Sequence, residues 1–346
     1  MATELTELEQ LLIKYMKHIS TTGIEEGLAK SIKSDLGKDG WLITQQSLPT
    51  NESRFNLLAT QSSQDKVRLI LNTHLDTVPP YIPPTFDDEN IYGRGSNDAK
   101  GQLVCMIMAA NEFIKRHPHL SDQIGLLFVV GEEVDHVGME EANHLGINPE
   151  YLIVGEPTEL KFATIQKGAL KVLLKANGVA GHSGYPKSGE SAVHKLIPVL
   201  NDVINHKWPT SEKIGDTTYN IGLIKGGQAQ NAWAESAEAN IFFRVTTSVE
   251  DIMQQLQSIV GDRVEIEVLG RNSPVILSPN PLGYPEESVA FNTDLPYYHK
   301  IREVKGKYLF GGGSIKNAHS DHEFMPRSEL AECQKVLVNL MEKLLL

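Results

Sequence analysis

The sequence predicts an α/β protein: a catalytic domain with a mostly parallel sheet, interrupted by an inserted α+β sandwich domain. Three observations lead to this prediction. Apolar runs of strand length recur in the first half of the chain, and each is followed by an acidic turn. From about residue 162 to 270 this pattern stops, and alternating strands and helices replace it. The chain has 346 residues, which is too long for one ordinary core and favours two domains.

The first part of the catalytic domain, residues 1–161, shows the strand, acidic turn and helix repeat of a parallel sheet. Leucines at helical spacing open the chain, and the later apolar runs are rich in Val, Ile and Leu. The expected elements are a helix over 4–20, strands over 67–72, 124–130 and 151–154, and a helix over 101–116. Ligands of parallel sheets bind beyond the carboxyl ends of the strands, so we expect a site there.

The inserted domain, residues 162–270, is predicted to be an antiparallel sheet with helices on one face. Strands are expected over 168–179, 219–225, 235–246 and 264–269, and helices over 191–205 and 249–261. The second part of the catalytic domain, residues 271–346, begins with a linker rich in Pro, Gly and Asn. It ends with a helix over 327–345.

Composition and charge exclude several classes of protein. The formal net charge of −12 argues against nucleic-acid binding and against an anionic membrane surface. No run is long enough to span a membrane, and the amphipathic, acidic N-terminal segment does not resemble a signal peptide. The only two cysteines, Cys105 and Cys333, are interpreted as free buried thiols in a reducing compartment. We therefore expect a cytoplasmic protein.

Seven acidic and imidazole side chains are candidates for a metal site. Two histidines with three or four carboxylates suit a pair of divalent metal ions such as zinc. Nearly all of them follow an apolar run or lie in a glycine-rich turn, where side chains can converge at one edge of a sheet. The candidates are His74, Asp76, Asp98, Glu132, Glu133, Glu156 and His319.

Each candidate, taken alone, also has an ordinary structural interpretation. His74 and Asp76 lie on the same side of a strand end, which suits a metal ligand with an orienting carboxylate, yet His-x-Asp is a common pattern. Asp98 lies among three glycines in residues 93–101, where a carboxylate can bridge two cations or simply occupy a tight turn. The prediction of a metal site rests on the whole set of candidates, because they occur together and nearly all follow an apolar run or lie in a glycine-rich turn.

Glu132 and Glu133 are adjacent carboxylates directly after a buried strand. Like charges raise one another's pKa. One carboxylate can bind metal while the other takes a proton from the attacking water, whose pKa a metal lowers to about 7.

The segments HLDTVP, GRGSNDAKG, GEE, GEPT and AH…E follow one another along the chain. In order and separation they resemble the M20 family of metal-dependent aminoacylases and peptidases, which includes acetylornithine deacetylase and succinyl-diaminopimelate desuccinylase. The resemblance runs from roughly residue 5 to the C-terminus. It implies a hydrolase of linear amides that uses two divalent metal ions, zinc or cobalt.

The resemblance implies a role for each candidate. Asp98 would bridge both metals, Asp76 would orient His74, and Glu132 would be the general base that later protonates the leaving amine. The metal ligands would be His74, Asp98, Glu133, Glu156 and His319.

The inserted domain resembles the dimerisation domain of the same family, which implies a homodimer. His182 matches a histidine that reaches across the dimer and stabilises the tetrahedral oxyanion. Asn231 and Arg244 match a pair that contacts the carboxylate of the substrate, a task for which Arg has bidentate geometry. On the residues alone, His182 would be taken as a loop histidine.

The expected reaction is deacylation of an N-acyl amino acid, as in acetylornithine deacetylase. The segments GEPT and FGGGSI…AH favour this branch of the family. A dipeptidase or carboxypeptidase is the first alternative. A non-catalytic binding homologue is the second, although neither a ligand nor Glu132 is lost. His322, next to Glu323, departs from the family pattern and is an extra candidate ligand.

Overall fold

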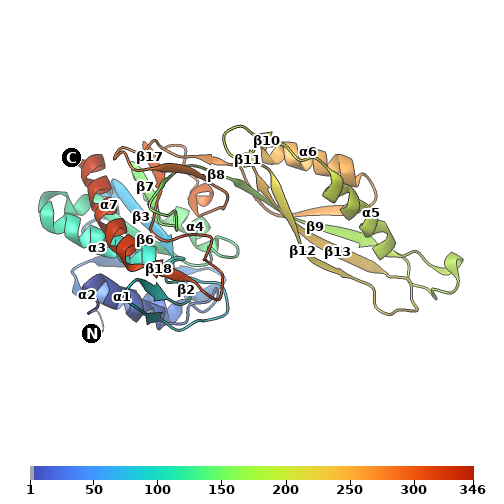
Figure 1. The fold of residues 1–346 in the computed structure, drawn as a ribbon, viewed down its shortest axis with the longest axis horizontal. Coiled ribbons are helices and arrows are strands. Elements are labelled where there is room, and N and C mark those ends of the chain that lie inside the picture. The colour runs from blue at the N-terminus through green and yellow to red at the C-terminus, as the bar shows by residue number, and fades with distance from the viewer. Residues whose placement is uncertain (1–3) are drawn as a thin grey trace. The chain divides into compact units, whose positions relative to one another are not determined.

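The computed structural model describes residues 4–346, and the chain forms two compact units (Figure 1). The first comprises the chain up to Thr164, Leu277–Glu287 and Thr293–Leu346, and the second comprises Ile165–Ile276 and Ser288–Asn292. The chain passes between the units within β8 (Phe162–Gln166), after β15 (Val275–Ile276), within β16 (Glu286–Val289) and between Asn292 and Thr293. The predicted class, an α/β catalytic domain with an inserted α+β domain, is confirmed.

The first unit contains a six-stranded mixed sheet in the order β1-β2-β6-β3-β7-β17. Strands β6, β3, β7 and β17 are parallel, whereas β1 and β2 form an antiparallel edge. Buried parallel strands need apolar residues on both faces, which explains the continuous apolar runs in the sequence. The bounds are β1 (Leu42–Leu48), β2 (Asn51–Thr60), β3 (Leu69–His74), β6 (Ile124–Val129), β7 (Tyr151–Val154) and β17 (Gly306–Leu309).

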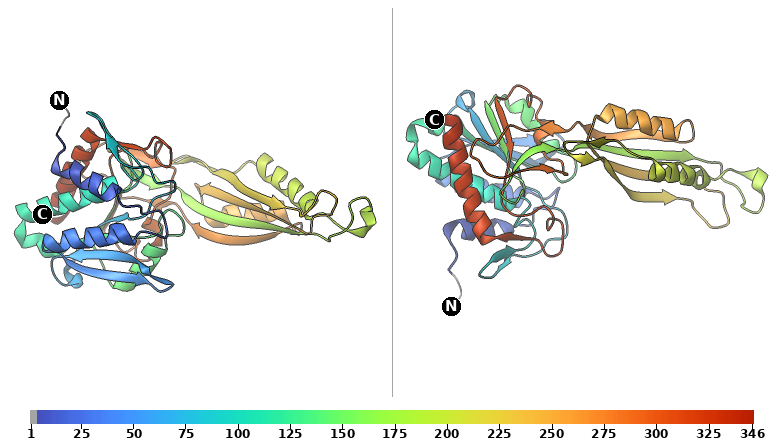
Figure 2. Two further views of the ribbon diagram at one scale, coloured as in Figure 1. Left: turned by 90° about the horizontal axis from the view of Figure 1, so that it is seen from below. Right: turned by 45° about the horizontal axis from the view of Figure 1, so that its top comes forward.

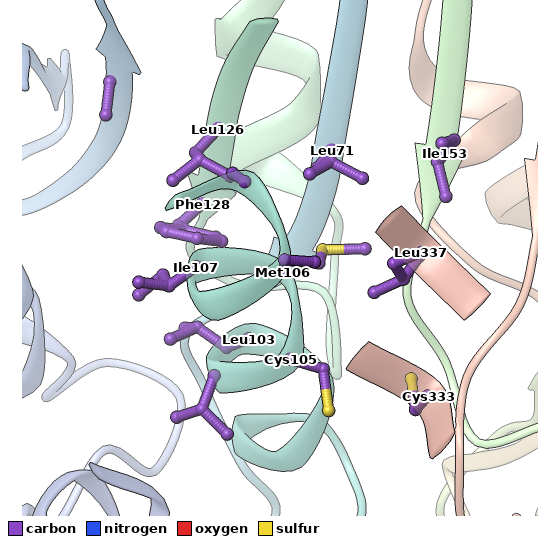
Figure 3. Packing of buried hydrophobic residues seen from close by; sticks show 14 of the residues in the cluster. Leu71, Leu103, Cys105, Met106, Ile107, Leu126, Phe128, Ile153, Cys333 and Leu337 are labelled. Atoms are coloured by element: carbon purple, nitrogen blue, oxygen red, sulfur yellow. The ribbon is translucent and has the colours of Figure 1, made fainter. Parts of the chain in front are cut away.

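Helix α3 (Lys100–Arg116) packs on β3 and β6, and α7 (Arg327–Leu345) packs on α3. In Figure 3, Leu71, Leu126 and Ile153 of three neighbouring strands point toward these helices. Each such buried side chain contributes roughly 1.5–3 kcal/mol, so this layer stabilises the packing of α3 on the sheet. Cys105 and Cys333 lie in the same layer and are free and buried, as predicted.

Smaller elements complete the first unit. Helix α1 begins after Thr6, because Thr6 and Glu9 form a capping box, and it is shorter than the predicted helix over 4–20. Over residues 4–346, no helix is both long and apolar enough to cross a membrane. The remaining elements are α1 (Glu7–Met16), α2 (Glu26–Lys38), α4 (Val137–Ala142) and a small sheet of β4 (Thr85–Phe86), β5 (Asn90–Tyr92) and β18 (Phe324–Pro326).

The second unit is an antiparallel sheet in the order β12-β13-β9-β14, with two helices packed on it (Figure 2). Along β9 every second residue is buried, among them Leu170, Val172 and Leu174, because one face of the sheet meets the helices. The bounds are β9 (Gly168–Asn177), β12 (Thr218–Gly226), β13 (Ser236–Val245), β14 (Glu265–Asn272), α5 (Ala192–Asn205) and α6 (Val249–Val260), with a two-stranded sheet of β10 (Thr210–Ser211) and β11 (Gly215–Asp216) beside them in the sequence.

Candidate metal centre and active site

Parallel strands carry four of the candidate side chains to one edge of the sheet. His74 is the last residue of β3 and is paired in register with Val129, the last residue of β6. Glu132 and Glu133 follow β6 after a short turn, and Glu156 follows β7. Because the carboxyl ends of parallel strands lie together, these side chains converge as the sequence predicts.

Two further candidates come from loops. Asp98 lies in the glycine-rich turn that precedes α3, and His319 lies between β17 and β18 with a φ of 63°. The side chain of Asn97 joins the two loops, because its Nδ2 donates to the carbonyl oxygen of Ser314 (2.7 Å) and to Oδ1 of Asn317 (2.9 Å). The turn and the loop are thereby held next to one another.

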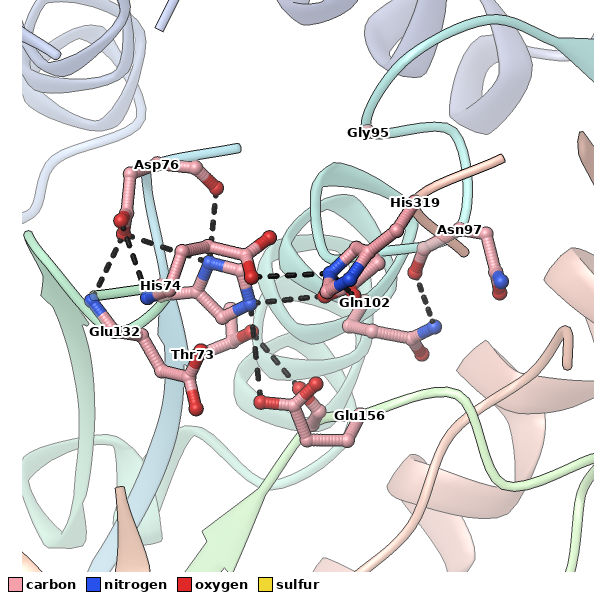
Figure 4. A network of polar contacts seen from close by, with 12 residues as sticks. Thr73, His74, Asp76, Gly95, Asn97, Gln102, Glu132, Glu156 and His319 are labelled. Atoms are coloured by element: carbon pink, nitrogen blue, oxygen red, sulfur yellow. Dashed lines mark hydrogen bonds and ion pairs between the residues drawn. The ribbon is translucent and has the colours of Figure 1, made fainter. Parts of the chain in front are cut away.

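His74, Asp98 and Glu156 form a first cluster. Figure 4 shows the His74 ring and the Glu156 carboxylate of this cluster facing one another. The Nε2 atom of His74 lies 3.0 Å from Oδ1 of Asp98 and 3.8 Å from Oε1 of Glu156. All three residues are buried.

Asp98, Glu133 and His319 form a second cluster. The Nε2 atom of His319 lies 3.2 Å from Oδ2 of Asp98 and 3.0 Å from Oε2 of Glu133. Asp98 therefore belongs to both clusters through different oxygens, with Oδ1 facing His74 and Oδ2 facing His319. This is the geometry expected of a carboxylate that bridges two ions.

The donor atoms of the two clusters fit divalent cations. In each cluster the three ligand atoms lie within 4.8 Å of one another, and imidazole nitrogens with carboxylate oxygens are ligands that zinc takes. Among the described residues, Oε1 of Glu133 is buried and has no hydrogen-bond partner. A buried carboxylate oxygen is costly without a donor or a cation next to it, so this atom also points to an ion.

Asp76 organises the turn that carries Glu132 and Glu133. Its Oδ1 accepts the N–H groups of Gly131 (3.0 Å) and Glu132 (3.1 Å), and its Oδ2 accepts the N–H of Glu133 (3.3 Å). The Nδ1 atom of His74 lies 2.9 Å from the carbonyl oxygen of Asp76 and 3.6 Å from its carboxylate Oδ1. The main chain of Asp76 thus orients the ring with Nε2 toward the first cluster, while the carboxylate holds the turn.

Glu132 lies beside two residues that the sequence pattern did not single out as site residues. The Nδ1 atom of His136 is 3.8 Å from Oε1 of Glu132 and 3.0 Å from Oδ1 of Asp294. The His136 ring stacks on Tyr297 with 3.9 Å between centroids. His136 stands in the same turn as Glu132, whereas Asp294 is 158 residues further along and gave no local signal.

Burial and crowded charges shift the pKa values at this site. Burial, followed by the charge of Glu156, raises the pKa of Glu132 well above its usual range. Burial, followed by the charge of Asp98, also raises the pKa of Glu133. Hydrogen bonds to Asp98 and Glu133 raise the pKa of His319 to about 10. Protons and divalent cations therefore compete for the same atoms.

In the second unit, His182 and Asn231 lie in two neighbouring loops. The N–H of Ser183 donates to the carbonyl oxygen of Asn231 (3.0 Å), and both His182 and Asn231 are exposed. The Nδ1 atom of His182 accepts the N–H of Gly184 (3.1 Å). In the neutral ring the proton then resides on Nε2, which is a hydrogen-bond donor.

Arg244 lies near the other end of β13, where its guanidinium group sits 4.2 Å from the centroid of the Phe242 ring. Ser236, which begins β13 on the side of the two loops, is about 26 Å away at a rise of about 3.3 Å per residue. Within one unit the fold therefore keeps Arg244 far from His182 and Asn231.

A mixed α/β sheet whose strands end in two clusters of imidazoles and carboxylates is a scaffold for a metal-dependent enzyme. Comparison with known proteins assigns the family. The chain is 36% identical over 317 residues to a peptidase M20 domain-containing protein of Schizosaccharomyces pombe, covering 90% of this chain and 78% of that protein. It is 35% identical to a probable carboxypeptidase of Ajellomyces capsulatus, covering 93% and 83% of the two chains. The protein belongs to the M20 peptidase family, whose members hydrolyse amide bonds.

Two further matches agree with this assignment. Residues 164–267 match the peptidase dimerisation domain of the family. A tripeptidase of Staphylococcus aureus has the same fold, with a TM-score of 0.79 at 21% identity and 97% of each chain covered. The predicted family membership is thus confirmed, while the acetylornithine deacetylase branch stays a prediction.

Proposed function

We propose that this protein is a two-metal hydrolase that cleaves an amide bond next to a free carboxylate, acting as a carboxypeptidase or dipeptidase on short peptides. The observation that carries the proposal is the position of Asp98, which has one carboxylate oxygen in each ligand cluster. The similarity to a probable carboxypeptidase supports a peptide substrate. The proposed ions are zinc or cobalt.

The ligands of the metal ions are the five residues of the two clusters. When bound, two divalent cations supply Lewis acidity, which polarises the amide carbonyl and acidifies the attacking water. Glu132 takes a proton from that water and delivers it to the leaving amine. A carboxyl group whose pKa is raised well above its usual range, as burial does for Glu132, suits both tasks. Asp76 positions Glu132 through the turn, and the proposed ligands are His74, Asp98, Glu133, Glu156 and His319.

The residues of the second unit bind the acyl oxygen and the free carboxylate of the substrate. Nε2 of His182 donates a hydrogen bond to the oxyanion, and Asn231 and Arg244 contact the carboxylate. One copy of β13 keeps Arg244 and the two loop residues too far apart to reach one small substrate together. In a homodimer, His182 and Asn231 come from one subunit and Arg244 from the other.

The second candidate is deacylation of an N-acyl amino acid such as N-acetylornithine. The segments 155–158 and 310–315, which resemble the deacetylase branch, lie side by side next to the first cluster. The N–H of Gly311 donates to Oγ1 of Thr158 (3.0 Å), two residues after Glu156. In both candidate reactions the substrate has an amide bond next to a free carboxylate. The substrates differ in the acyl group, which is an aminoacyl group in a dipeptide and an acetyl group in N-acetylornithine.

A panel of matched substrates tests the proposal. Protein loaded with Zn²⁺ or Co²⁺ is offered dipeptides, N-acetylornithine and the C-terminal amide of each. Hydrolysis of the acids and not of the amides is expected. Turnover of dipeptides supports the peptidase, whereas turnover of N-acetylornithine alone supports the deacylase. Equal hydrolysis of acids and amides would contradict recognition of a carboxylate.

A further inference from the structure

A buried carboxylate outside the two ligand clusters holds the turn that carries Asp98. Glu323 is only 1% exposed, and its Oε1 accepts three main-chain N–H groups of this turn. The donors are Gly95 (3.0 Å), Asn97 (3.1 Å) and Asp98 itself (3.1 Å). The bridging residue is thus fixed through its own main chain.

The second oxygen of Glu323 binds Arg94, the residue that begins the same turn. The Nη1 atom of Arg94 lies 2.6 Å from Oε2 of Glu323, and the Arg94 side chain is also buried. The main-chain carbonyl of Glu323 accepts the N–H of Gly93 (3.0 Å). A buried ion pair is favourable only when its remaining polar atoms are satisfied. Both carboxylate oxygens have close donors and Nε of Arg94 donates to the carbonyl oxygen of Pro80 (3.3 Å), whereas Nη2 of Arg94 is buried without a hydrogen-bond partner among the described residues.

The fold brings Glu323 to this turn from 225 residues away in the sequence. Strand β18 follows Glu323 directly and pairs with β5, with Phe324 opposite Tyr92. That register places Glu323 next to the start of the turn. His319 lies four residues earlier, so one short segment carries a ligand of the second cluster and the anchor of the bridging ligand.

We propose that Glu323, paired with Arg94, is a positioning residue that holds Asp98 between His74 and His319 and so sets the affinity of the protein for its metal ions. This inference rests on the two-metal site proposed above. Groups that orient metal ligands typically change metal affinity by about 10- to 100-fold when they are removed. Loss of this anchor affects both ions, because Asp98 belongs to both clusters.

The test is a zinc titration of metal-free protein by competition with a chelating dye, with thermal unfolding measured in parallel. The Zn²⁺ dissociation constant of Glu323→Ala should rise by about 100-fold and that of Glu323→Gln by about 10-fold. The Gln amide oxygen can still accept the three N–H groups, although the charge facing Arg94 is gone. If Glu323→Ala does not fold, Glu323→Gln carries the test.

Glu9→Gln is the matched control. Glu9 is a buried glutamate of the same unit, and its side chain is bound by Arg327 (2.6 Å) and by the N–H of Thr6. This variant should lose stability and keep the wild-type affinity for zinc. The inference is overturned if the Glu323 variants also lose only stability and bind zinc as tightly as the wild type. A wild-type protein that binds neither Zn²⁺ nor Co²⁺ would overturn the two-metal function itself.

Discussion

At the scale of single residues, Glu132 and the ligands differ in what surrounds them. The donor atoms of the two clusters face one another, whereas Glu132 faces His136 and forms with His136 and Asp294 a third group of donor atoms within 4.8 Å of one another. The Asp76 carboxylate accepts the main-chain N–H of Glu132, and the Glu132 side chain belongs to neither ligand cluster. A substitution of Glu132 therefore removes the proposed proton-transfer group and leaves the proposed metal ligands in place.

Replacing Glu132 by Gln should lower turnover by about 10²- to 10⁴-fold while the metal content stays at the wild-type value, because general acid–base catalysis is lost and no ligand is removed. Steady-state kinetics and elemental analysis of the same preparation check this. Glu140→Gln is the control, since Glu140 is a surface residue paired with His299. Wild-type turnover in Glu132→Gln would rule out its role as the base.

The raised pKa values give a second prediction for single residues. Because His319 has a pKa of about 10 without metal, it holds a proton at pH 7 that a cation must displace. Metal binding should therefore release protons, and the affinity for Zn²⁺ should rise with pH. Calorimetric titrations in buffers of different ionisation enthalpy measure the protons released. No release at pH 7 would contradict the ion pairs of His319.

At the scale of elements, the strands were predictable and the contacts among the loops were not. Continuous apolar runs identify β3, β6 and β7, because parallel strands are buried on both faces, and the candidate ligands follow their ends. The edge strands β1 and β2 and the helix α2 were not predicted, since polar residues interrupt their patterns. Neither Asp294 nor the anchoring role of Glu323 was predicted, because their contacts depend on residues more than 150 positions away.

The loop that carries His319 depends on Gly313. This residue has a φ of 76°, and a Cβ atom there would lie 1.9 Å from Oδ1 of Asn97, the residue that joins this loop to the Asp98 turn. Gly313→Ala should therefore reduce stability by about 2–6 kcal/mol, from about 1–3 kcal/mol of backbone strain and about 1–3 kcal/mol of overpacking, and should weaken zinc binding.

Gly283→Ala is the matched control for that substitution. Gly283 has a φ of 77°, and a methyl group there would meet open space, so only backbone strain should be felt. Urea unfolding and zinc titration of both variants measure the difference. Equal behaviour of the two variants would show that contact with Asn97 does not position the loop.

At the scale of the whole molecule, the residues proposed for catalysis and substrate binding belong to two different units of the chain. The metal clusters belong to the first unit, and His182, Asn231 and Arg244 belong to the second. The sequence predicts that these residues lie in different domains, because the pattern of apolar strands followed by acidic turns stops at about residue 162. The homodimer and the cytoplasmic location stay predictions.

Mixing subunits tests whether one site uses both copies of the chain. Glu132→Ala and His182→Ala should each be nearly inactive alone. Random mixing gives about half heterodimers, each with one complete site of two, so about a quarter of wild-type activity should return. A mixture no more active than its parents would contradict a contribution of His182 from the partner subunit.

The central claim is that two ions share Asp98 and that hydrolysis requires both. The most direct measurement titrates chelator-treated protein with Zn²⁺ while bound metal and dipeptide hydrolysis are followed together. We expect about two ions per chain, with full activity restored at the second equivalent, and less than about one ion per chain in Asp98→Asn. Hydrolysis that survives chelation, or two ions bound by Asp98→Asn as tightly as by the wild type, would contradict the claim.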